Sequence, residues 1–468
     1  MPSNNRRSLR QTLAGLAPAR LGAVLDSGAK VRLADTLMGT NLAGGNGQAA
    51  GRTVLLAADG QLASALALIA LDGVARDIVL CPPDLSAEHQ VVIARRVAAD
   101  LVVTDLAEGT LPGLQDMKHV RCLPAIAIIE GNVAPSVTTN WVLLTSGTSG
   151  PPKAVRHTLA TLTGAIGSTP ANADAVVWST FYDIRRYGGL QIYLRAVLGG
   201  HTMVLSSADE PMADFLARAA AAGATHVTGT PSHWRSALMT GAINTITPGY
   251  VRLSGEIAGQ VILDGLRAAF PQARIVHAFA STEAGVAFEV TDEREGFPAS
   301  YVGREAGPVS MRVAGGALQI RSDRTAFEYV GESGAPLRDA EGYVDTGDMV
   351  DLRGDRYHFT GRRGGIINVG GAKVHPEEVE AVINRHPAVQ ISLVKARSNP
   401  IMGAIVAAEI VLKGSPAAGR SSEELDTIRN EITALCQAGL AAHKVPLSLR
   451  FVASLPTTPS GKLARPNA

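Results

Sequence analysis

Short apolar runs alternate with longer alanine-rich stretches through the first part of the chain. The runs that we predict as strands are residues 53–56, 77–80, 101–103, 142–144, 176–178, 203–205, 226–228 and 274–276. Helical stretches lie between them, for example at residues 62–71 and 89–97. Strands that alternate with helices indicate layered α/β structure around a largely parallel sheet. In such sheets, ligands bind beyond the carboxyl ends of the strands.

The pattern changes near Phe297 and again at residues 361–365. Between Phe297 and Tyr357, glycine-punctuated short strands predict a small β-barrel or meander. After residue 365 the pattern predicts an α+β unit: one strand before a helix at 376–384, strands at 391–395 and 404–411, and a helix at 422–440.

Two domains follow from these changes. We predict a large N-terminal domain, residues 1–361, made of layered α/β subdomains and the β-barrel-like part. A small, mobile α+β domain, residues 362–468, completes the chain. Gly364 and Gly365, which follow two arginines, are a plausible hinge because glycine accommodates large backbone rotations.

Composition and charge narrow the possible partners. The 468 residues carry a formal net charge of +1 and no long basic run, so we do not expect nucleic acid or an anionic membrane as a partner. The most apolar stretch, residues 62–75, is too short to span a bilayer and contains Asp72. Three cysteines, scattered without metal-ligand spacing, indicate a reducing compartment, and we predict a cytoplasmic protein.

The N-terminal segment before Asp26 has no acidic residue and several arginines, a composition that transit peptides share. Pro18 and Arg20 interrupt any apolar core of the kind that a secretory signal needs. We interpret this segment as an ordinary basic first helix.

The strand at 142–144 runs into the sequence TSGTSGPPK, which ends at Lys153. Its glycines let backbone amides approach a ligand closely, and consecutive amides form an anion-binding nest. The hydroxyl donors here are Thr145, Ser146, Thr148 and Ser149, and the glycines are Gly147 and Gly150. We predict a phosphate-binding loop, distinct from the common nucleotide loop because two prolines precede the lysine. The alternative is a Ser/Gly linker.

Two carboxylates also follow predicted strands. Glu283, after the strand at 274–276, is a candidate anchor for Mg²⁺, and Thr282 is a candidate phosphate donor. The alternative is a helix N-terminus capped by Ser281 or Thr282. Asp348 follows another predicted strand and can accept from both ribose hydroxyls, although a bare Thr-Gly-Asp is more often a simple turn.

The order of these segments resembles the adenylate-forming superfamily, which includes acyl-CoA synthetases, peptide-synthetase adenylation domains and luciferases. The matching segments are TSGTSGPPK, FASTE, YVDTGD, GRRGGIINVGGAKVHPEEVE and PTTPSGKLAR. Together they are highly specific, and the resemblance covers roughly residues 50 to 465. One departure is Ala280, which stands where the family usually has glycine.

The resemblance implies a role for each matching residue. The β- and γ-phosphates of ATP are expected at Thr145, Ser146, Gly147, Thr148, Ser149, Gly150 and Lys153. Adenine is expected between Phe279 and the segment Ser254, Gly255 and Glu256, with Ala280 and Ser281 beside it. The α-phosphate is expected at Thr282, Mg²⁺ at Glu283, and the ribose at Asp348 and Arg362.

The resemblance also implies a catalytic lysine. Lys462 is expected to bridge the substrate carboxylate and the α-phosphate, because a cation there stabilises the charge that builds up in the transition state. After rotation of the small domain, Lys462 leaves and the loop at 365–371 lines a passage for a thiol.

The stretch that corresponds to the family's acyl pocket lacks the usual histidine and holds Asp183, Arg185 and Arg186. One reading is that Arg185 or Arg186 binds a second anionic group of the substrate. Another is that Asp183 holds the ammonium group of an amino acid. A third is that Asp183 and Arg186 pair with each other near the surface.

We therefore expect an acid–thiol ligase that uses a small-molecule carboxylic acid, ATP, Mg²⁺ and CoA. A stand-alone adenylation enzyme that loads a separate carrier protein is the first alternative, since no carrier segment follows Lys462. A catalytically silent nucleotide-binding homologue is the second.

Overall fold

The computed structural model describes most of the chain. The residues described are 7–107, 109–128, 132–145, 151–167, 175–207, 209–304, 307–331, 336–369, 372–399, 403–414, 419–456 and 463–464. The centre of the predicted phosphate loop, residues 146–150, and the predicted catalytic Lys462 lie outside them.

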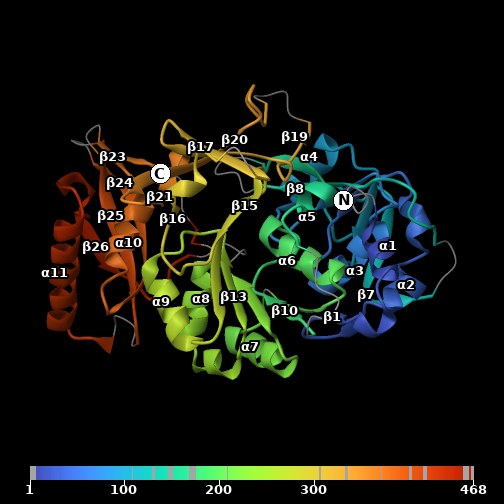
Figure 1. The fold of residues 1–468 in the computed structure, drawn as a ribbon, viewed down its shortest axis with the longest axis horizontal. Helices are drawn as coiled ribbons and strands as arrows, with labels where there is room; N and C mark the ends of the chain where they lie inside the picture. The colour runs from blue at the N-terminus through green and yellow to red at the C-terminus, as the bar shows by residue number, and fades with distance from the viewer. Residues whose placement is uncertain are drawn as a thin grey trace.

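One eight-stranded sheet is built mainly from the first third of the chain (Figure 1, blue to cyan). Its order is β19 (Glu328–Tyr329), β9 (Ala154–Thr158), β8 (Asn140–Leu144), β5 (Asp77–Leu80), β4 (Thr53–Leu56), β6 (Leu101–Thr104), β7 (His119–Ala127) and β3 (Thr40–Leu42). The ladder from β8 to β7 is parallel, as predicted. Its central strands are fully buried because helices cover both faces.

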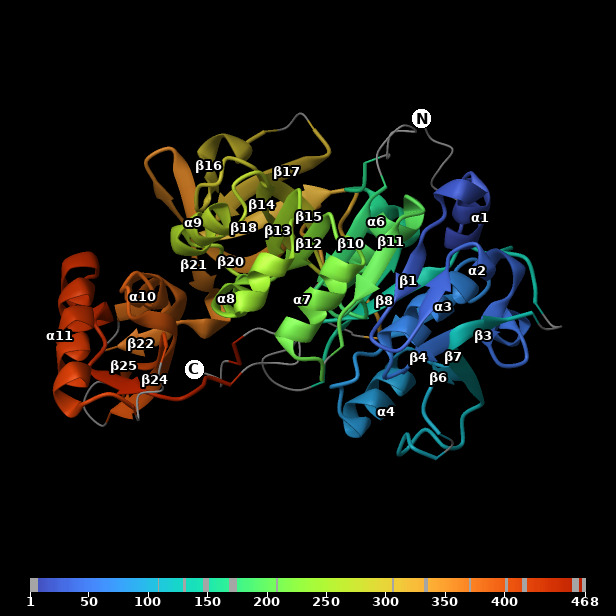
Figure 2. The same cartoon turned by 90° about the horizontal axis from the view of Figure 1, so that it is seen from below.

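A second eight-stranded sheet stands beside the first (Figure 2). Its order is β15 (Gly285–Val290), β14 (Arg274–Ser281), β13 (Tyr250–Ser254), β12 (His226–Gly229), β10 (Val177–Thr180), β11 (Thr202–Leu205), β1 (Ala23–Leu25) and β2 (Lys30–Arg32). The strands from β14 to β1 are parallel, and the two edge strands are antiparallel. The predicted layered α/β class is thus confirmed.

Helices α3 (Gln61–Leu71) and α6 (Tyr187–Leu198) contribute to one hydrophobic core that both sheets share. Every residue of α3 is buried, which explains its nearly uniform apolar sequence. The other face of the second sheet packs on α7 (Met212–Ala221), α8 (Pro231–Met239) and α9 (Gln260–Ala269). The predicted basic first helix is present as the short α1 (Leu9–Ala14), capped by Ser8.

The region predicted as a β-barrel or meander is a five-stranded antiparallel sheet. Its order is β16 (Phe297–Pro298), β21 (Arg356–Arg362), β20 (Val344–Arg353), β18 (Ala317–Ser322) and β17 (Val309–Ala314). A cluster of aromatic side chains packs this sheet against β14 and β15 of the second large sheet. The ends of β20 and β21 are thereby brought toward the end of β14.

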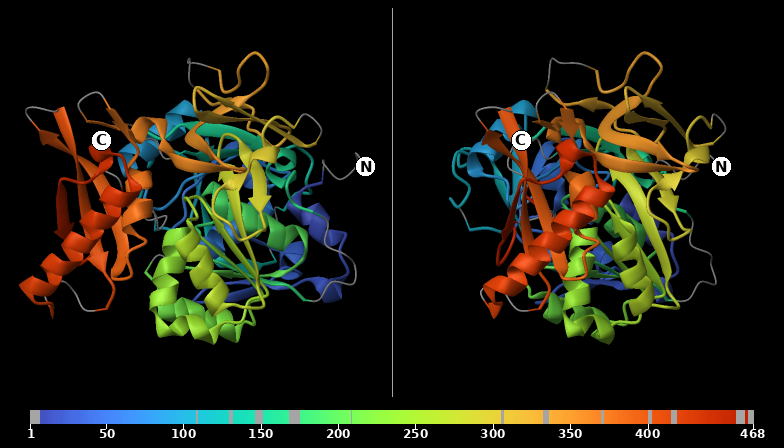
Figure 3. Two further views of the ribbon diagram at one scale, coloured as in Figure 1. Left: turned by 60° about the vertical axis from the view of Figure 1, so that its left-hand side comes forward. Right: turned by 90° about the vertical axis from the view of Figure 1, so that its left-hand side faces the viewer.

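The C-terminal part has its own hydrophobic core (Figure 3, orange to red). Its elements are the hairpin β22 (Ile367–Val369) and β23 (Ala372–Val374), helices α10 (Pro376–Ile383) and α11 (Ser422–Gly439), and the sheet of β24 (Val389–Asn399), β25 (Gly403–Leu412) and β26 (Ser448–Phe451). The predicted α+β class is confirmed, although the sequence did not predict β26 or the hairpin. The domain boundary at residue 361 and the hinge at Gly364 and Gly365 remain predictions.

Within the described residues, no helix combines the length and the apolar character that a membrane span requires.

Candidate active site

The base of the predicted phosphate loop is a hairpin between β8 and β9. The backbone N–H of Thr145 donates to the carbonyl of Lys153 at 2.9 Å, and Leu144 pairs with Ala154. Because β8 runs parallel to β5, this hairpin turns at the carboxyl edge of the first sheet. The loop therefore leaves the sheet at the edge where α/β folds bind ligands.

Four charged residues interact electrostatically beyond that edge, and one of them, Lys153, also places Nζ 4.6 Å from the centroid of the Tyr329 ring. Arg362 Nε donates to Asp348 Oδ1 at 3.0 Å, and the two residues pair across β20 and β21. Burial raises the pKa of Glu283; Asp348 adds to this rise, whereas Arg362 and Lys153 oppose it. Lys153, Glu283, Asp348 and Arg362 thus share one electrostatic environment, although they come from three separate parts of the chain.

Thr282 and Glu283 form the turn between β14 and β15. The alternative of a capped helix N-terminus is therefore wrong, because β15 pairs back onto β14 and no helix begins there. The carbonyl of Glu283 accepts from Ala326 N–H at 2.9 Å, and Ser281 Oγ accepts from Ala284 N–H at 3.0 Å. The turn is consequently fixed on both sides.

His157 on β9 also holds this turn, and sequence reasoning did not identify it. Its Nε2 lies 2.7 Å from the carbonyl oxygen of Thr282, and its Nδ1 lies 2.9 Å from Thr161 Oγ1. Burial lowers the pKa of His157 to about 4, so the ring is neutral at neutral pH. Since a carbonyl oxygen can only accept, Nε2 carries the proton. The strand that follows the phosphate loop is thereby linked to the Thr282–Glu283 turn.

The segment expected to line adenine follows β13. Ser254 interacts with the hydroxyl of Tyr182, which lies 2.9 Å from its carbonyl oxygen and 3.1 Å from its backbone nitrogen. Gly255 has a φ of +84°, a conformation that suits glycine, and Glu256 accepts from the backbone and the hydroxyl of Ser232 at the start of α8. The chain is thus tightly held beside the predicted nucleotide site.

Phe279, the other predicted neighbour of adenine, lies among aromatic rings. Its ring is nearly parallel to those of Phe359 and Phe288, with centroid distances of 5.0 and 5.7 Å. Ala280 and Ser281 continue the same strand toward Thr282. Contact of any of these residues with a nucleotide remains a prediction.

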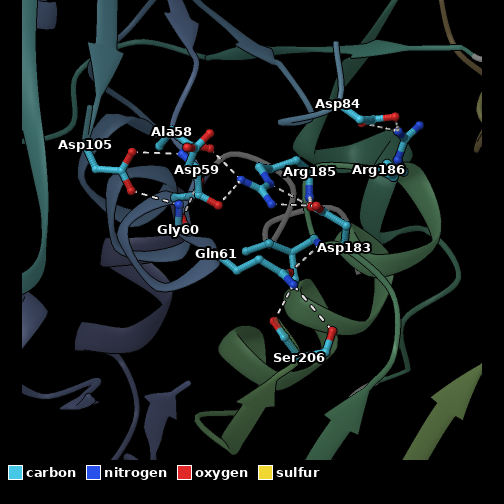
Figure 4. A network of polar contacts seen from close by, with 12 residues as sticks. Ala58, Asp59, Gly60, Gln61, Asp84, Asp105, Asp183, Arg185, Arg186 and Ser206 are labelled. Atoms are coloured by element: carbon cyan, nitrogen blue, oxygen red, sulfur yellow. Dashed lines mark hydrogen bonds and ion pairs between the residues drawn. The ribbon is translucent and has the colours of Figure 1, made fainter. Parts of the chain in front are cut away.

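The three charged residues of the predicted acyl pocket are already engaged with protein groups (Figure 4). Arg185 Nη2 lies 2.6 Å from Asp183 Oδ2, and Arg185 Nε donates to Asp183 Oδ1 at 2.8 Å. Arg186 pairs instead with Asp84. The reading that Asp183 pairs with Arg186 is therefore wrong, because Arg185 contacts both carboxylate oxygens of Asp183.

This pair fastens the loop after β10 to the first sheet (Figure 4). Arg185 Nη1 donates to the carbonyls of Ala58 and Asp59, in the loop that leads into α3. Gln61 accepts from the backbone N–H of Ile184 at 2.9 Å and donates to the carbonyl of Ser206 at 2.6 Å. The loop therefore joins both large sheets, and it sets the positions of the tyrosines on either side of it.

A magnesium ion fits the donor set at Glu283. Among the described residues, no group of three histidines, cysteines or carboxylates could form a complete protein cage. Mg²⁺ that binds together with substrate phosphates takes only one or two protein carboxylates and keeps several waters. A single half-buried carboxylate beside a predicted phosphate loop meets that requirement.

The sequence matches two family descriptions, AMP-binding enzyme over residues 37–324 and AMP-binding enzyme C-terminal domain over residues 378–462. Feruloyl-CoA synthase of Amycolatopsis sp. is 28% identical over 355 residues, which cover 69% of this chain and 68% of that protein.

Solved structures share the fold at low sequence identity. The anthranilate CoA ligase AuaEII in complex with anthranoyl-AMP superposes with a TM-score of 0.78 at 18% identity, over 98% of this chain and 96% of that chain. O-succinylbenzoate coenzyme A synthetase from Bacillus subtilis, in complex with ATP and magnesium ion, gives 0.73 at 19% identity, over 97% and 98%. The first family match alone spans more than half of the sequence. The chain therefore belongs to the AMP-binding enzyme family, within the adenylate-forming superfamily.

Proposed function

We propose that this protein is an ATP- and Mg²⁺-dependent acid–thiol ligase. It converts a carboxylic acid and ATP into an acyl-adenylate and pyrophosphate, and then transfers the acyl group to CoA. The observation that carries the proposal is the convergence of Lys153, Glu283 and the Asp348–Arg362 pair beyond the carboxyl edges of the sheets. Family membership supports the first half-reaction, and relatives named as CoA synthases support the second.

The residues of the first half-reaction act by position and charge. A carboxylic acid is already ionised at neutral pH, so attack on the α-phosphorus needs no general base. The difficulty is that two anions must approach each other, and Lys153 and Lys462 supply positive charge for that approach. Asp348 and Arg362 hold the ribose, and Thr282 donates to the α-phosphate. The geometry of Thr282 is maintained by His157 through the carbonyl on the same residue.

Glu283 is the residue that would hold the magnesium ion. When bound, Mg²⁺ supplies neutralising charge to the phosphate oxygens of the leaving pyrophosphate. Burial raises the pKa of Glu283, so part of its ability to bind a cation is lost as pH falls toward that pKa. Lys153 and Arg362 oppose that rise and keep the carboxylate available.

The amino-acid alternative finds little support in the described residues. Asp183, its candidate ammonium ligand, already faces the guanidinium of Arg185 through both oxygens. A substrate ammonium would have to compete with a fixed, bidentate charge pair. Non-amino acids are therefore the better substrates to try first.

Acid-dependent exchange of labelled pyrophosphate into ATP tests the proposal. We expect exchange with at least one acid of a broad panel, and release of a CoA thioester when CoA is then added. Transfer to added carrier proteins but not to CoA would instead identify a carrier-loading enzyme. Absence of exchange with every acid would favour the catalytically silent homologue.

A further inference from the structure

Two arginines meet one carboxylate in the space between α6 and the β13–β15 edge of the second sheet. Arg252 on β13 contacts Glu289 on β15, and its Nη1 also lies 3.4 Å from the hydroxyl of Tyr250. Arg195 on α6 places Nη2 3.7 Å from Glu289 Oε1. The side chain of Arg252 is 5% exposed and that of Arg195 is 17% exposed. Glu289 is therefore shared by two largely buried guanidinium groups.

Arg324 brings a third positive charge to the same place. It follows β18, and its Nη1 donates to the carbonyl of Val286 on β15 at 3.1 Å. Tyr187, the first residue of α6, lies in the field of all three arginines. Burial raises the pKa of Tyr187, and Arg324, Arg195 and Arg252 each oppose that rise. We refer to Arg195, Arg252, Glu289 and Arg324 as the arginine cluster.

The arginine cluster carries a net positive charge, because three guanidinium groups share one carboxylate. Among the residues that the structure describes, Glu289 is the carboxylate that interacts with all three arginines. Arg195 Nε is buried and makes no hydrogen bond to any described group. Unbalanced guanidinium groups that are withdrawn from water are costly, whereas a bidentate carboxylate partner compensates them well. The cluster thus lacks an anion.

A cavity of about 300 Å³ opens onto this cluster. Its charged lining residues are Glu289, Arg324 and Arg304, and Arg304 lies over the ring of Tyr301. Phe288, Tyr301, Val309 and Met311 form its apolar and aromatic wall. This size lies at the lower end of the range for small-molecule sites. A small ligand with a carboxylate at one end matches both its polar and its apolar walls.

The cavity lies close to the place where the acid reacts. Glu289 pairs with Ala278 on β14, and Thr282 lies four positions after Ala278. At about 3.3 Å per strand residue, the backbone distance from Ala278 to Thr282 is roughly 13 Å. A long arginine side chain can span part of that distance. Contacts also connect the two places, since the ring of Tyr187 lies 5.8 Å from that of His157, which holds the carbonyl of Thr282.

We propose that the acid activated by this protein is a small dicarboxylic acid whose second carboxylate binds at Arg324 and is stabilised by Arg195 and Arg252. This inference rests on the proposed ligase function and names its substrate class. A second substrate anion was also one sequence-based reading of Arg185 and Arg186. Arg185 and Arg186 each have a carboxylate partner within the protein, whereas the three arginines of the arginine cluster share one carboxylate.

Pyrophosphate exchange with matched pairs of acids tests the inference. The pairs are malonic and propanoic, succinic and butanoic, glutaric and pentanoic, and adipic and hexanoic acid. We expect at least one dicarboxylic acid to exceed its partner by about tenfold to a hundredfold in kcat/KM, the range for one hydrogen-bonded charge. Arg324→Gln should remove most of that preference by raising KM for the dicarboxylic acid, with KM for ATP unchanged. Arg324→Lys should retain part of the preference.

Arg218→Gln is the matched control. Arg218 lies on α7, is 18% exposed and pairs with Glu210, so its loss also removes a half-buried guanidinium, but at a distance from the cavity. This variant should retain the wild-type preference. Equal use of both acids of every pair, or an equal loss for both acids in Arg324→Gln, would overturn the inference while leaving the ligase function in place. Absence of exchange with every acid of these pairs, when another acid of the broad panel supports exchange, would also overturn the inference. Absence of exchange with every acid of the broad panel would refute the ligase function itself.

Discussion

Two groups of arginines lie near the predicted acid site, and they differ in how their charges are balanced. In the loop after β10, Arg185 and Arg186 each have a carboxylate partner, Asp183 and Asp84. In the arginine cluster, three guanidinium groups share Glu289. Arg185 connects the two large sheets (Figure 4). The arginine cluster instead adjoins a cavity.

The difference shows that residue type and nearness to a site do not identify a binding residue. Arg185 stands where the sequence suggested a substrate contact, yet its donors are directed at Asp183 and at two backbone carbonyls. Arg195 lies ten residues further along the chain, and its buried Nε has no hydrogen-bond partner among the described residues. The balance of charge within each group separates structural arginines from candidate binding ones.

Removal of Arg185 should produce the largest effect on stability. Arg185→Ala leaves Asp183 without its partner in a mostly buried position and frees the carbonyls of Ala58 and Asp59. We expect a loss of about 3 kcal/mol in the free energy of unfolding, at the lower end for a broken buried pair. Chemical denaturation measures it. If the loss is below about 1 kcal/mol, the loop is not fastened as described.

His157, which packs beside Tyr187 at the border of the two regions, should make stability depend on pH. Its pKa in the folded protein is lowered from 6.5 to about 4, so its contribution is fully present above pH 6.5 and is lost as pH falls toward 4. The loss amounts to about 3 kcal/mol. His226, with a pKa also lowered to about 4, acts in the same direction.

Denaturation of the wild type and of His157→Gln at several pH values isolates the contribution of His157. Glutamine retains an N–H donor for the carbonyl of Thr282 but does not titrate. Other partly buried histidines, among them His201 and His277, also have lowered pKa values, so we expect the variant to lose part of the pH dependence between pH 6.5 and pH 4. An unchanged slope would show that His157 is not buried in its neutral form.

Arg362 is an intermediate case, because it pairs with Asp348 and also opposes the raised pKa of Glu283. In Arg362→Gln that opposition disappears, so the pKa of Glu283 should rise further. Mg²⁺ dependence of pyrophosphate exchange, measured across pH, should then weaken at a higher pH than in the wild type. If the Mg²⁺ dependence weakens at the same pH in Arg362→Gln as in the wild type, Arg362 does not influence the ionisation of Glu283.

Arg186→Ala should have the smallest effect and completes the comparison. The Arg186–Asp84 pair is partly exposed, with 24% and 28% of the two side chains accessible. Pairs of this kind contribute about 0–1 kcal/mol, so unfolding and acid preference should stay close to wild type. A loss as large as that of Arg185→Ala would contradict the distinction between the buried and the exposed pair.

The sequence predicted the buried strands well because parallel strands covered on both faces appear as continuous apolar runs, as in β4 and β5. It did not predict β7 or the N-terminal edge strands. Exposed and buried residues do not alternate regularly in β7, and several of these strands pair with segments that are distant in the sequence. Such strands depend on tertiary contacts more than on local pattern.

The candidate site was predictable where one segment carries the chemistry and not where several segments must meet. The segments around Glu283, Asp348 and Arg362 stood out in the sequence, and the fold brings them together. The partner of Asp183 depends on the approach of the loop before α3, and the arginine cluster joins four separate segments. His157 gave no local signal, because its partner lies 125 positions away.

Direct detection of the mixed anhydride tests the central claim. The protein is incubated with ATP, Mg²⁺ and a dicarboxylic acid in the absence of thiol, and the products are identified by mass spectrometry. We expect an enzyme-bound acyl-adenylate together with pyrophosphate, and conversion of that adenylate to a thioester and AMP once CoA is added. ATP that remains intact with every acid, or that is cleaved to ADP and phosphate instead, would contradict the central claim.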